Sequence, residues 1–320
     1  MNMQFIYRPE GFYHSKTVRK EYNIDYIQNA IKRKFIMESK AIKLNTSNEL
    51  ILAISDGVIG LIQLNDFEDI EESRLKLSYM YSKVGMYIKY IPQEILEEPD
   101  ENGNTIVICS RRESQKQCKE KYISTLKPGD IINARIMNLH NKSIFCDIGC
   151  GVPAILPIDS YCVARLVDPV EDLRGIREIK AIVCSIKEDG SIFLSHKELL
   201  GTWYDEVQGL SVGDTVIGTV SKIESFGAFV TLSPNLFGLA NKSANIKEGD
   251  TVYVSVKAIV PEKMKVKLII KSVQNNADGL SLKPVYKIKD THIDYWKYSP
   301  DEYTGQVIER KFTMDEKVDE

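Results

Sequence analysis

The sequence lacks the residue groupings that usually hold a metal ion. Its six cysteines include no Cys-x-x-Cys pair, and its four histidines are scattered without a cysteine partner at zinc-site spacing. Cys146 and Cys150 flank the end of an expected strand, but nothing nearby supplies two further ligands. Unpaired cysteines are typical of reducing compartments. The pattern therefore favours reduced thiols over the alternative of a metal site, and no cofactor is expected.

Long apolar runs and an excess of basic charge are also missing. No stretch approaches the roughly 18 apolar residues of a membrane span. The N-terminal stretch MNMQFIYRPEGF lacks the charged and apolar regions of a signal peptide. The 42 basic and 45 acidic residues nearly cancel, so bulk charge does not indicate a nucleic-acid partner, although a binding face needs only local charge. We expect a soluble cytoplasmic protein without a membrane partner.

Motifs of enzyme active sites are absent as well. The sequence contains no GxxxxGK[ST] phosphate loop, no GxSxG nucleophile turn, and no paired histidine and carboxylate motif at metal spacing. Asp147 and Asp159 bracket one turn, but separated acids in a small β-domain are usually surface or turn residues. We therefore expect no catalytic activity.

What the sequence does contain is one unit present in three copies. Ser110 and Ser195 lie 85 residues apart near the ends of the first and second copies, and Gly129 and Gly213 lie 84 residues apart near the starts of the second and third. Two independent landmarks with nearly the same period indicate a repeat. The stretches that align at the start of the unit are residues 126–139, 210–223 and, more weakly, 31–44.

Each copy is typical of a small β-barrel. Short segments alternate Val, Ile, Phe and Tyr with polar residues, and Gly, Asn and Asp separate them. A unit of about 60 to 85 residues with about five strands fits a closed Greek-key barrel of the OB type, and closure removes exposed strand edges. Between the copies, residues 111–125 and 196–209 are polar and poor in Gly and Pro, which predicts short helical linkers. The expected fold is mainly β, with three tandem five-stranded barrels.

The third copy resembles the S-one RNA-binding domain, the repeat named for the largest protein of the bacterial small ribosomal subunit. The resemblance is carried by GDTVIGTVSKIESFGAFVTL, FGLANKS, KEGDTVYVSVKAI and KVKLIIKS. The link from SRRE to LKPGD before the second copy is also similar to junctions in that ribosomal protein. The implied division of the chain is an N-terminal extension (1–27), barrels at 28–111, 126–197 and 212–273, and a C-terminal tail (274–320).

The resemblance implies an RNA-binding face on the third copy. Both aromatic residues of its FGAF motif, Phe226 and Phe229, match the family's RNA-contacting positions. Asn241 stands where the family has a histidine, and Lys265 matches a basic position on the last hairpin. Pro261 stands where the family has an acid, so part of the family's face is changed.

The residues themselves support the same face independently. Two rings on one barrel surface form a platform for unpaired bases, and stacking contributes about 1–3 kcal/mol per base. Residues 213–272 carry eight Lys against five Asp and Glu, a local charge of +3 in a chain whose net charge is −3. Lys222 and Lys242 are among these lysines and are positioned to neutralise phosphates.

The alternative is that the two rings fill the barrel core. Residues spaced by three point to opposite faces of a regular strand. One ring should therefore be buried unless Gly227 forms a bulge that turns both rings to one side. We favour the shared exposed face, and burial of Phe226 would instead favour a protein-interaction scaffold that has lost RNA binding.

The other two copies have drifted from this pattern. In the second copy Lys142 and Phe145 replace the aromatic pair, and with Arg135 they form a candidate secondary RNA site. The alternative is that Lys142 is simply a solvated side chain beside a loop. In the first copy Asn48 and Ile51 stand at these positions, so we expect an intact barrel without a base platform.

The expected function is non-catalytic binding of single-stranded mRNA in translation, as the resemblance implies. The first two barrels would then dock on the small ribosomal subunit. A regulator of RNA decay or transcription elongation is a second interpretation. In the tail, the aromatic residues of HIDYWKYSPDEY (292–303) are expected to pack on a barrel, the alternative being a pocket with His292. The last residues, 314–320, are expected to be disordered.

Overall fold

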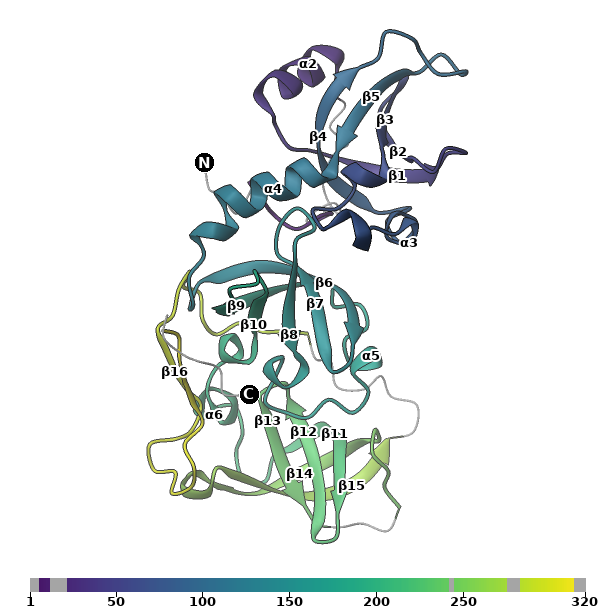
Figure 1. The fold of residues 1–320 in the computed structure, drawn as a ribbon. Helices are drawn as coiled ribbons and strands as arrows, with labels where there is room; N and C mark the ends of the chain where they lie inside the picture. Colours follow the sequence, from purple (N-terminus) through teal and green to yellow (C-terminus); the bar gives the residue numbers. More distant parts are fainter. Residues whose placement is uncertain (1–5, 12–21, 242–244, 275–282, 314–320) are drawn as a thin grey trace. The chain divides into compact units, whose positions relative to one another are not determined.

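The computed structural model describes residues 6–11, 22–241, 245–274 and 283–313 (Figure 1). Lys242, most of the expected linker at 274–279 and the final residues 314–320 lie outside the described residues. The chain divides into two compact units. Unit 1 comprises Met1–Leu126, Asn133–Arg135 and Asp147–Pro153, and unit 2 comprises Lys127–Ile132, Ile136–Cys146 and Ala154–Glu320.

Three closed five-stranded barrels make up most of the described chain, as the sequence predicts. The first contains β1 (Met37–Leu44), β2 (Leu50–Ser55), β3 (Val58–Ile62), β4 (Tyr87–Ile95) and β5 (Thr105–Ser110). The second contains β6 (Ile131–His140), β7 (Ser143–Asp147), β8 (Pro153–Pro157), β9 (Glu178–Ile186) and β10 (Ile192–Ser195). The third contains β11 (Thr215–Glu224), β12 (Gly227–Ser233), β13 (Leu236–Ala240), β14 (Thr251–Val260) and β15 (Lys265–Gln274).

The strand order is the same in every barrel, which confirms the threefold repeat. Within each copy the first strand pairs with the second, the second with the third, the third with the fifth, the fifth with the fourth, and the fourth closes on the first. The third and fifth strands run parallel in all three copies (β3 with β5, β8 with β10, β13 with β15). The first strand pairs antiparallel with the second and the fourth, as β1 does with β2 and β4 and β11 with β12 and β14. This is the connectivity expected of OB-type barrels.

The Gly-Asp landmarks perform the same task in the second and third copies. Gly129 and Gly213 have φ angles of 92° and 99°, a region that favours glycine. The N–H of Gly129 donates to the carbonyl of Val183, and that of Gly213 to the carbonyl of Val256, both at 2.8 Å. The glycine therefore ties the start of each copy to its fourth strand, and this constraint explains the period seen in the sequence.

The helices lie outside the barrels. They are α2 (Ile24–Arg33), α3 (Leu77–Tyr81), α4 (Arg111–Lys121), α5 (Pro169–Asp172) and α6 (Trp203–Val207), with one-turn 3₁₀ segments at Leu64–Asp66, Glu72–Arg74, Ile123–Thr125, Ile158–Ser160, Lys197–Leu200 and Pro261–Lys263. The helical linkers expected at 111–125 and 196–209 are confirmed. The weak alignment of residues 31–44 mixes two elements, because its first residues end α2 and β1 begins at Met37.

Asp147 differs from the sequence-based expectation of a surface or turn acid, because its side chain is only 2% exposed. Within unit 1 its Oδ2 accepts the N–H of Glu10 at 2.7 Å, and its Oδ1 accepts the N–H groups of Gly149 and Gly151 at 2.8 and 3.0 Å. Burial, and secondarily the charge of Glu10, raise the pKa of this carboxyl to about 6. The acid is buried because it satisfies three backbone donors.

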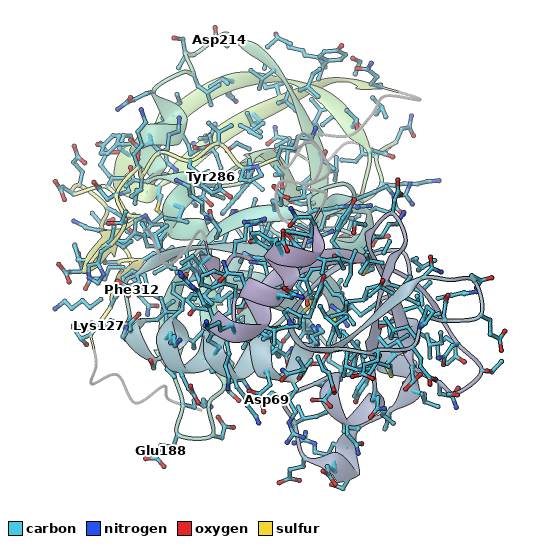
Figure 2. All side chains as sticks on the ribbon, turned by 90° about the horizontal axis from the view of Figure 1, so that it is seen from above. Asp69, Lys127, Glu188, Asp214, Tyr286 and Phe312 are labelled. Carbon is cyan, nitrogen blue, oxygen red and sulfur yellow. The ribbon has the colours of Figure 1, made fainter. Side chains whose placement is uncertain are left out.

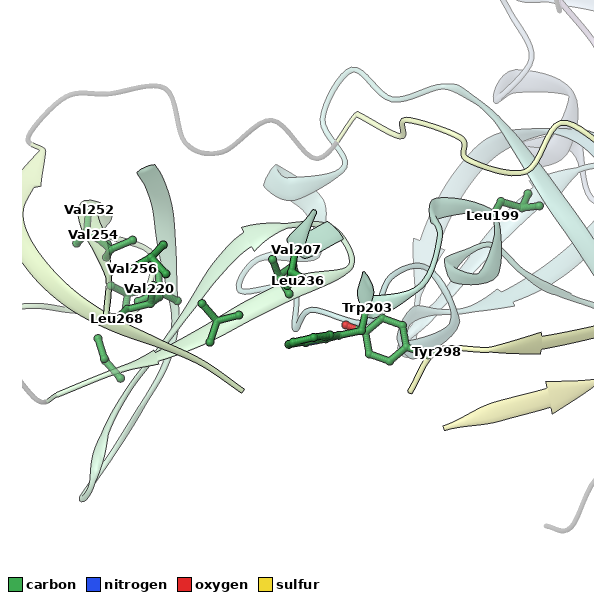
Figure 3. Packing of buried hydrophobic residues seen from close by; sticks show 14 of the residues in the cluster. Leu199, Trp203, Val207, Val220, Leu236, Val252, Val254, Val256, Leu268 and Tyr298 are labelled. Atoms are coloured by element: carbon green, nitrogen blue, oxygen red, sulfur yellow. The ribbon is translucent and has the colours of Figure 1, made fainter. Parts of the chain in front are cut away.

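The core of unit 2 joins barrel residues to the tail, whose short strands are β16 (Tyr295–Lys297) and β17 (Glu309–Lys311). Trp203 of α6 and Tyr298 of the tail lie together in this cluster, as Figure 3 shows. The hydroxyl of Tyr298 donates to the carbonyl of Asn235 at 2.5 Å. The expectation that the aromatic tail packs on a barrel is thereby confirmed.

Candidate nucleic-acid interface

Phe226 and Phe229 lie at the hairpin of β11 and β12, outside the barrel core. Phe226 belongs to the turn between the two strands, and its side chain is 65% exposed. Phe229 is half-buried within β12. Their ring centroids are 6.1 Å apart, and the ring planes are nearly perpendicular at 86°. The alternative in which Phe226 fills the core is therefore wrong.

The bulge that was expected at Gly227 lies on the opposite strand instead. The register of β11 and β12 shifts between Val220 and Lys222, and Gly227 pairs regularly with Glu224. Phe226 can share a side with Phe229 because it sits in the turn, where strand alternation does not apply. Gly227 is required for another reason: a Cβ at this position would lie 2.5 Å from the carbonyl oxygen of Ala240.

A third ring, missed in the sequence, extends the aromatic surface. Phe237 of β13 is half-buried, and its centroid lies 5.9 Å from that of Phe229 with an interplanar angle of 65°. Its neighbour two residues on, Leu239, pairs directly with Phe229. The alternation of β13 could have revealed this, because residues two apart on a strand share a face.

Lysines border this aromatic surface on both sides. Lys222 of β11 pairs with Phe229, and Leu239 of β13 pairs with Lys267 of β15. Cross-strand partners point to the same face, so Lys222, Phe229, Leu239 and Lys267 form one row across four strands. Lys265 lies two residues before Lys267 on β15 and is also exposed. We call these side chains, with Phe226 and Phe237, the third-barrel face.

Two details modify the predicted contacts of this face. The ammonium of Lys222 forms an ion pair with Glu224 of the same strand, so this lysine would exchange one anionic partner for another on binding phosphate. Asn241 is exposed and directly follows β13. Its neighbour Lys242 lies outside the described residues, so its predicted contact remains a prediction.

The residues of the predicted secondary site on the second barrel fall in different units of the chain. Lys142 occupies the turn between β6 and β7, and Phe145 is half-buried on β7, the positions that Phe226 and Phe229 occupy in the third barrel. Both residues belong to unit 2, whereas Arg135 belongs to unit 1. There its guanidinium donates a hydrogen bond to the carbonyl of Glu10.

The first barrel has no ring at the equivalent positions. Asn48 lies in the turn between β1 and β2 with a φ of 62°, and Ile51 is half-buried on β2. The strands and their pairing are intact. The expectation for this copy therefore agrees with the structure at these two positions.

The described residues also bear on metal and membrane chemistry. Among them, no group of three or more His, Cys, Asp or Glu side chains could hold a metal ion. Burial raises the pKa of the Cys162 thiol to about 12, and it raises that of Cys109 as well. Within the described ranges, every helix is too short or too polar to span a membrane.

These observations define the class of protein: a tandem array of three OB-type barrels, one of which carries an aromatic surface flanked by lysines. No model of a known protein family matches the chain. The chain is similar, however, to small ribosomal subunit protein bS1 of Staphylococcus aureus (strain COL), with 26% identity over 205 residues covering 59% of this chain and 52% of that protein. The resemblance inferred from the sequence is confirmed.

Two further relatives show the same similarity. The bS1 homolog of Bacillus subtilis (strain 168) is 26% identical over 196 residues, covering 56% of this chain and 51% of the relative. The bS1 protein of Staphylococcus saprophyticus is 27% identical over 231 residues, covering 67% and 54%. The chain therefore spans about half the length of the curated relatives it matches.

Two solved structures match the chain with low structural similarity. A multidomain protein with nucleic acid binding domains from Streptococcus pneumoniae matches over 74% of this chain and 73% of its own, with 12% identity and a TM-score of 0.24. Protein MJ1198 from Methanocaldococcus jannaschii matches over 18% of this chain and 89% of its own, with 27% identity and a TM-score of 0.18.

Proposed function

We propose that this protein binds single-stranded RNA through the third-barrel face and acts on mRNA during translation without catalysing a reaction. The observation that carries the proposal is the contact chain of Phe226, Phe229 and Phe237 on the surface. Rings of this kind stack on unpaired bases whatever their sequence, and the flanking lysines neutralise the backbone. Bases paired in a duplex cannot reach such rings, so single strands are the preferred ligand.

Docking on the small ribosomal subunit through the first two barrels is the second part of the proposal. It is supported by the similarity to small ribosomal subunit protein bS1 and by the absence of rings at Asn48 and Ile51 in the first barrel. The scaffold interpretation is less favoured, because Phe226 is 65% exposed and free of the core. A regulator of RNA decay or transcription elongation would use the same face, and no specific observation favours it.

The test measures RNA affinity and thermal stability together in single-residue variants. Phe226→Ala and Phe229→Ala should each weaken binding of a single-stranded RNA by about 1–3 kcal/mol, with little change in melting temperature. A core Phe→Ala would instead cost about 3–5 kcal/mol of folding stability. Phe35→Ala is the matched control, because Phe35 is 41% exposed and lies in the link between α2 and β1, outside the third barrel. Unchanged RNA affinity in both face variants would overturn the proposal.

The ribosomal part needs its own measurement. The double variant Phe226→Ala/Phe229→Ala should still sediment with purified small ribosomal subunits, because its first two barrels are untouched. If docking is lost together with RNA binding, the two activities use one surface and the proposed division between barrels is wrong.

A further inference from the structure

The second barrel repeats the strand register of the third but places its aromatic residues differently. In the third barrel Lys267 pairs in parallel with Leu239 and, beside a bulge, with Ala258. In the second barrel Phe193 of β10 pairs in parallel with Ile155 and, beside a bulge, with Ser185. Phe193 therefore stands at the position of Lys267. A phenylalanine replaces a lysine at the same point of the barrel surface.

Three apolar side chains follow one another on the outside of the second barrel. Phe145 of β7, Ile155 of β8 and Phe193 of β10 are all half-buried, and each lies between two buried neighbours on its strand. Strand alternation directs all three outward. In the second barrel the isoleucine thus lies between two rings. In the third barrel the equivalent row consists of Phe229, Leu239 and Lys267.

Basic groups accompany these rings. The ammonium of Lys187, from the turn between β9 and β10, lies 5.0 Å from the centroid of the Phe193 ring. Lys142 is exposed in the turn that precedes β7. Figure 2 labels Glu188, which lies in the same turn as Lys187. In that turn the carboxylate of Asp189 accepts a hydrogen bond from the N–H of Ser191 at 2.8 Å. Lysines beside rings suit a ligand that combines flat bases with phosphates.

We propose that Phe145, Ile155 and Phe193 form a second site for single-stranded nucleic acid, with Lys142 and Lys187 contacting its phosphates. The site uses Phe193 in place of the ring that the second barrel lacks at the Phe226 position, where Lys142 stands. For its class of ligand, the inference rests on the proposed function of the third-barrel face. It extends the candidate pair Lys142 and Phe145 by the side chains of Ile155, Phe193 and Lys187, which the sequence did not mark.

Photocrosslinking of the full chain separates the two sites. The probe is an oligouridylate of about 20 nucleotides, long enough for two OB folds, with 4-thiouridine along its length, and mass spectrometry identifies the linked peptides. We expect links to β7 or β10 as well as to β12. Links to β12 alone would overturn the second site and leave the proposed function standing. Links to β7 or β10 without any to β12 would support the second site and overturn the proposed function of the third-barrel face. If neither region is linked, both proposals are overturned.

Affinity measurements then test the residues. In the full chain carrying Phe226→Ala and Phe229→Ala, adding Phe193→Leu should lower affinity for the same oligonucleotide about five- to 150-fold, because leucine fills the position without a stacking ring. Phe35→Leu in that background is the control and should change nothing. Lys187→Gln should reduce the slope of log affinity against log salt by about 0.7. If neither Phe193→Leu nor Lys187→Gln changes binding, the second site is ruled out.

Discussion

At the scale of single residues, two positions are tightly constrained by the atoms around them. Gly227 lies at the start of β12, where the chain passes close to the end of β13. His196 follows β10 and is fully buried, with its ring stacked on Tyr161 at a centroid distance of 4.5 Å. The first residue supports the third-barrel face, and the second supports the core of unit 2.

Gly227→Val should impair both folding and RNA binding. The valine Cβ would begin 2.5 Å from the carbonyl oxygen of Ala240, so β12 and β13 would have to separate beneath Phe229. We expect a lower melting temperature and weaker binding of single-stranded RNA, measured on the same preparation. Gly209→Val is the control, because no atom lies within 4 Å of a Cβ there. Normal stability and affinity in Gly227→Val would contradict the packing described for the hairpin.

Unit 2 should lose stability as the pH falls because of His196. Burial lowers the pKa of this imidazole to about 4, and its Nδ1 lies 2.6 Å from the carbonyl oxygen of Tyr161. A lowered histidine pKa means that the unfolded chain binds the proton first. The stabilisation is therefore present above about pH 6.5 and is lost towards pH 4, by an amount of about 3 kcal/mol.

Unfolding by denaturant at several pH values measures this loss. Trp203 and Trp296 are the two tryptophans of the chain and both belong to the core of unit 2, so their fluorescence reports on that unit. His196→Asn keeps a donor for the Tyr161 carbonyl but does not titrate. It should flatten the dependence on pH between 4 and 6.5. The same slope in the variant and the parent protein would assign the pH effect to other groups.

At the scale of elements, strand β15 supplies the charge of the third-barrel face while β12 and β13 supply the rings. Lys265 and Lys267 alternate with buried Val266 and Leu268, so both lysines point outward from the barrel. Electrostatic contacts to phosphate depend on salt, whereas stacking depends on it little. The two contributions can therefore be separated in one experiment.

The double variant Lys265→Gln/Lys267→Gln should bind RNA with a weaker salt dependence. Each phosphate contact on a single strand contributes about −0.7 to the slope of log affinity against log salt, so losing two contacts should make the slope less steep by about 1.4. Fluorescence anisotropy over a series of salt concentrations gives this slope. Lys289→Gln, at an exposed position of the tail, is the matched control. An unaltered slope would show that β15 does not meet the backbone.

At the scale of the whole molecule, the described part of the tail, residues 283–313, contacts both the second and the third barrel within unit 2. The carboxylate of Glu198 is fully buried after β10, and it accepts a hydrogen bond from Arg310 of β17 at 2.8 Å. The hydroxyl of Tyr286 accepts the N–H of Lys180 on β9 at 2.7 Å. The described part of the tail thus contributes to the core of unit 2, in which Phe312 is buried and against which Tyr286 packs; Figure 2 labels both residues.

Arg310→Met should destabilise unit 2 by about 3 kcal/mol, because it leaves the Glu198 carboxylate buried without its cation. Because 33% of the Arg310 side chain is exposed, the loss should lie near the lower limit of the roughly 3–5 kcal/mol that breaking a buried ion pair costs. Adding Glu198→Leu should restore most of the stability, since an apolar pair removes the uncompensated charge. Tryptophan fluorescence during denaturation follows both variants. No recovery in the double variant would mean that Glu198 has another stabilising role.

Much of the architecture follows from the sequence because its causes are local. Alternating apolar residues direct one face of each strand inward, and the Gly-Asp turns recur because Gly129 and Gly213 need positive φ angles. The polar linkers become helices α4 and α6 with their own caps, Ser110 and Thr202. Three barrels, their order and the aromatic pair of the third could therefore be inferred without a structure.

What only the tertiary structure decided depends on pairing between distant strands. A bulge shifts every side chain beyond it to the other face, so register determines which residues become neighbours. The bulge in β11 places Lys222 opposite Phe229, and the pairing of β10 with β8 and β9 places Phe193 beside Ile155, neighbours that the local motifs do not mark. The burial of Asp147 likewise depends on Glu10, which lies 137 residues away in the sequence. By itself the sequence determined the barrels, and long-range packing determined the faces they present.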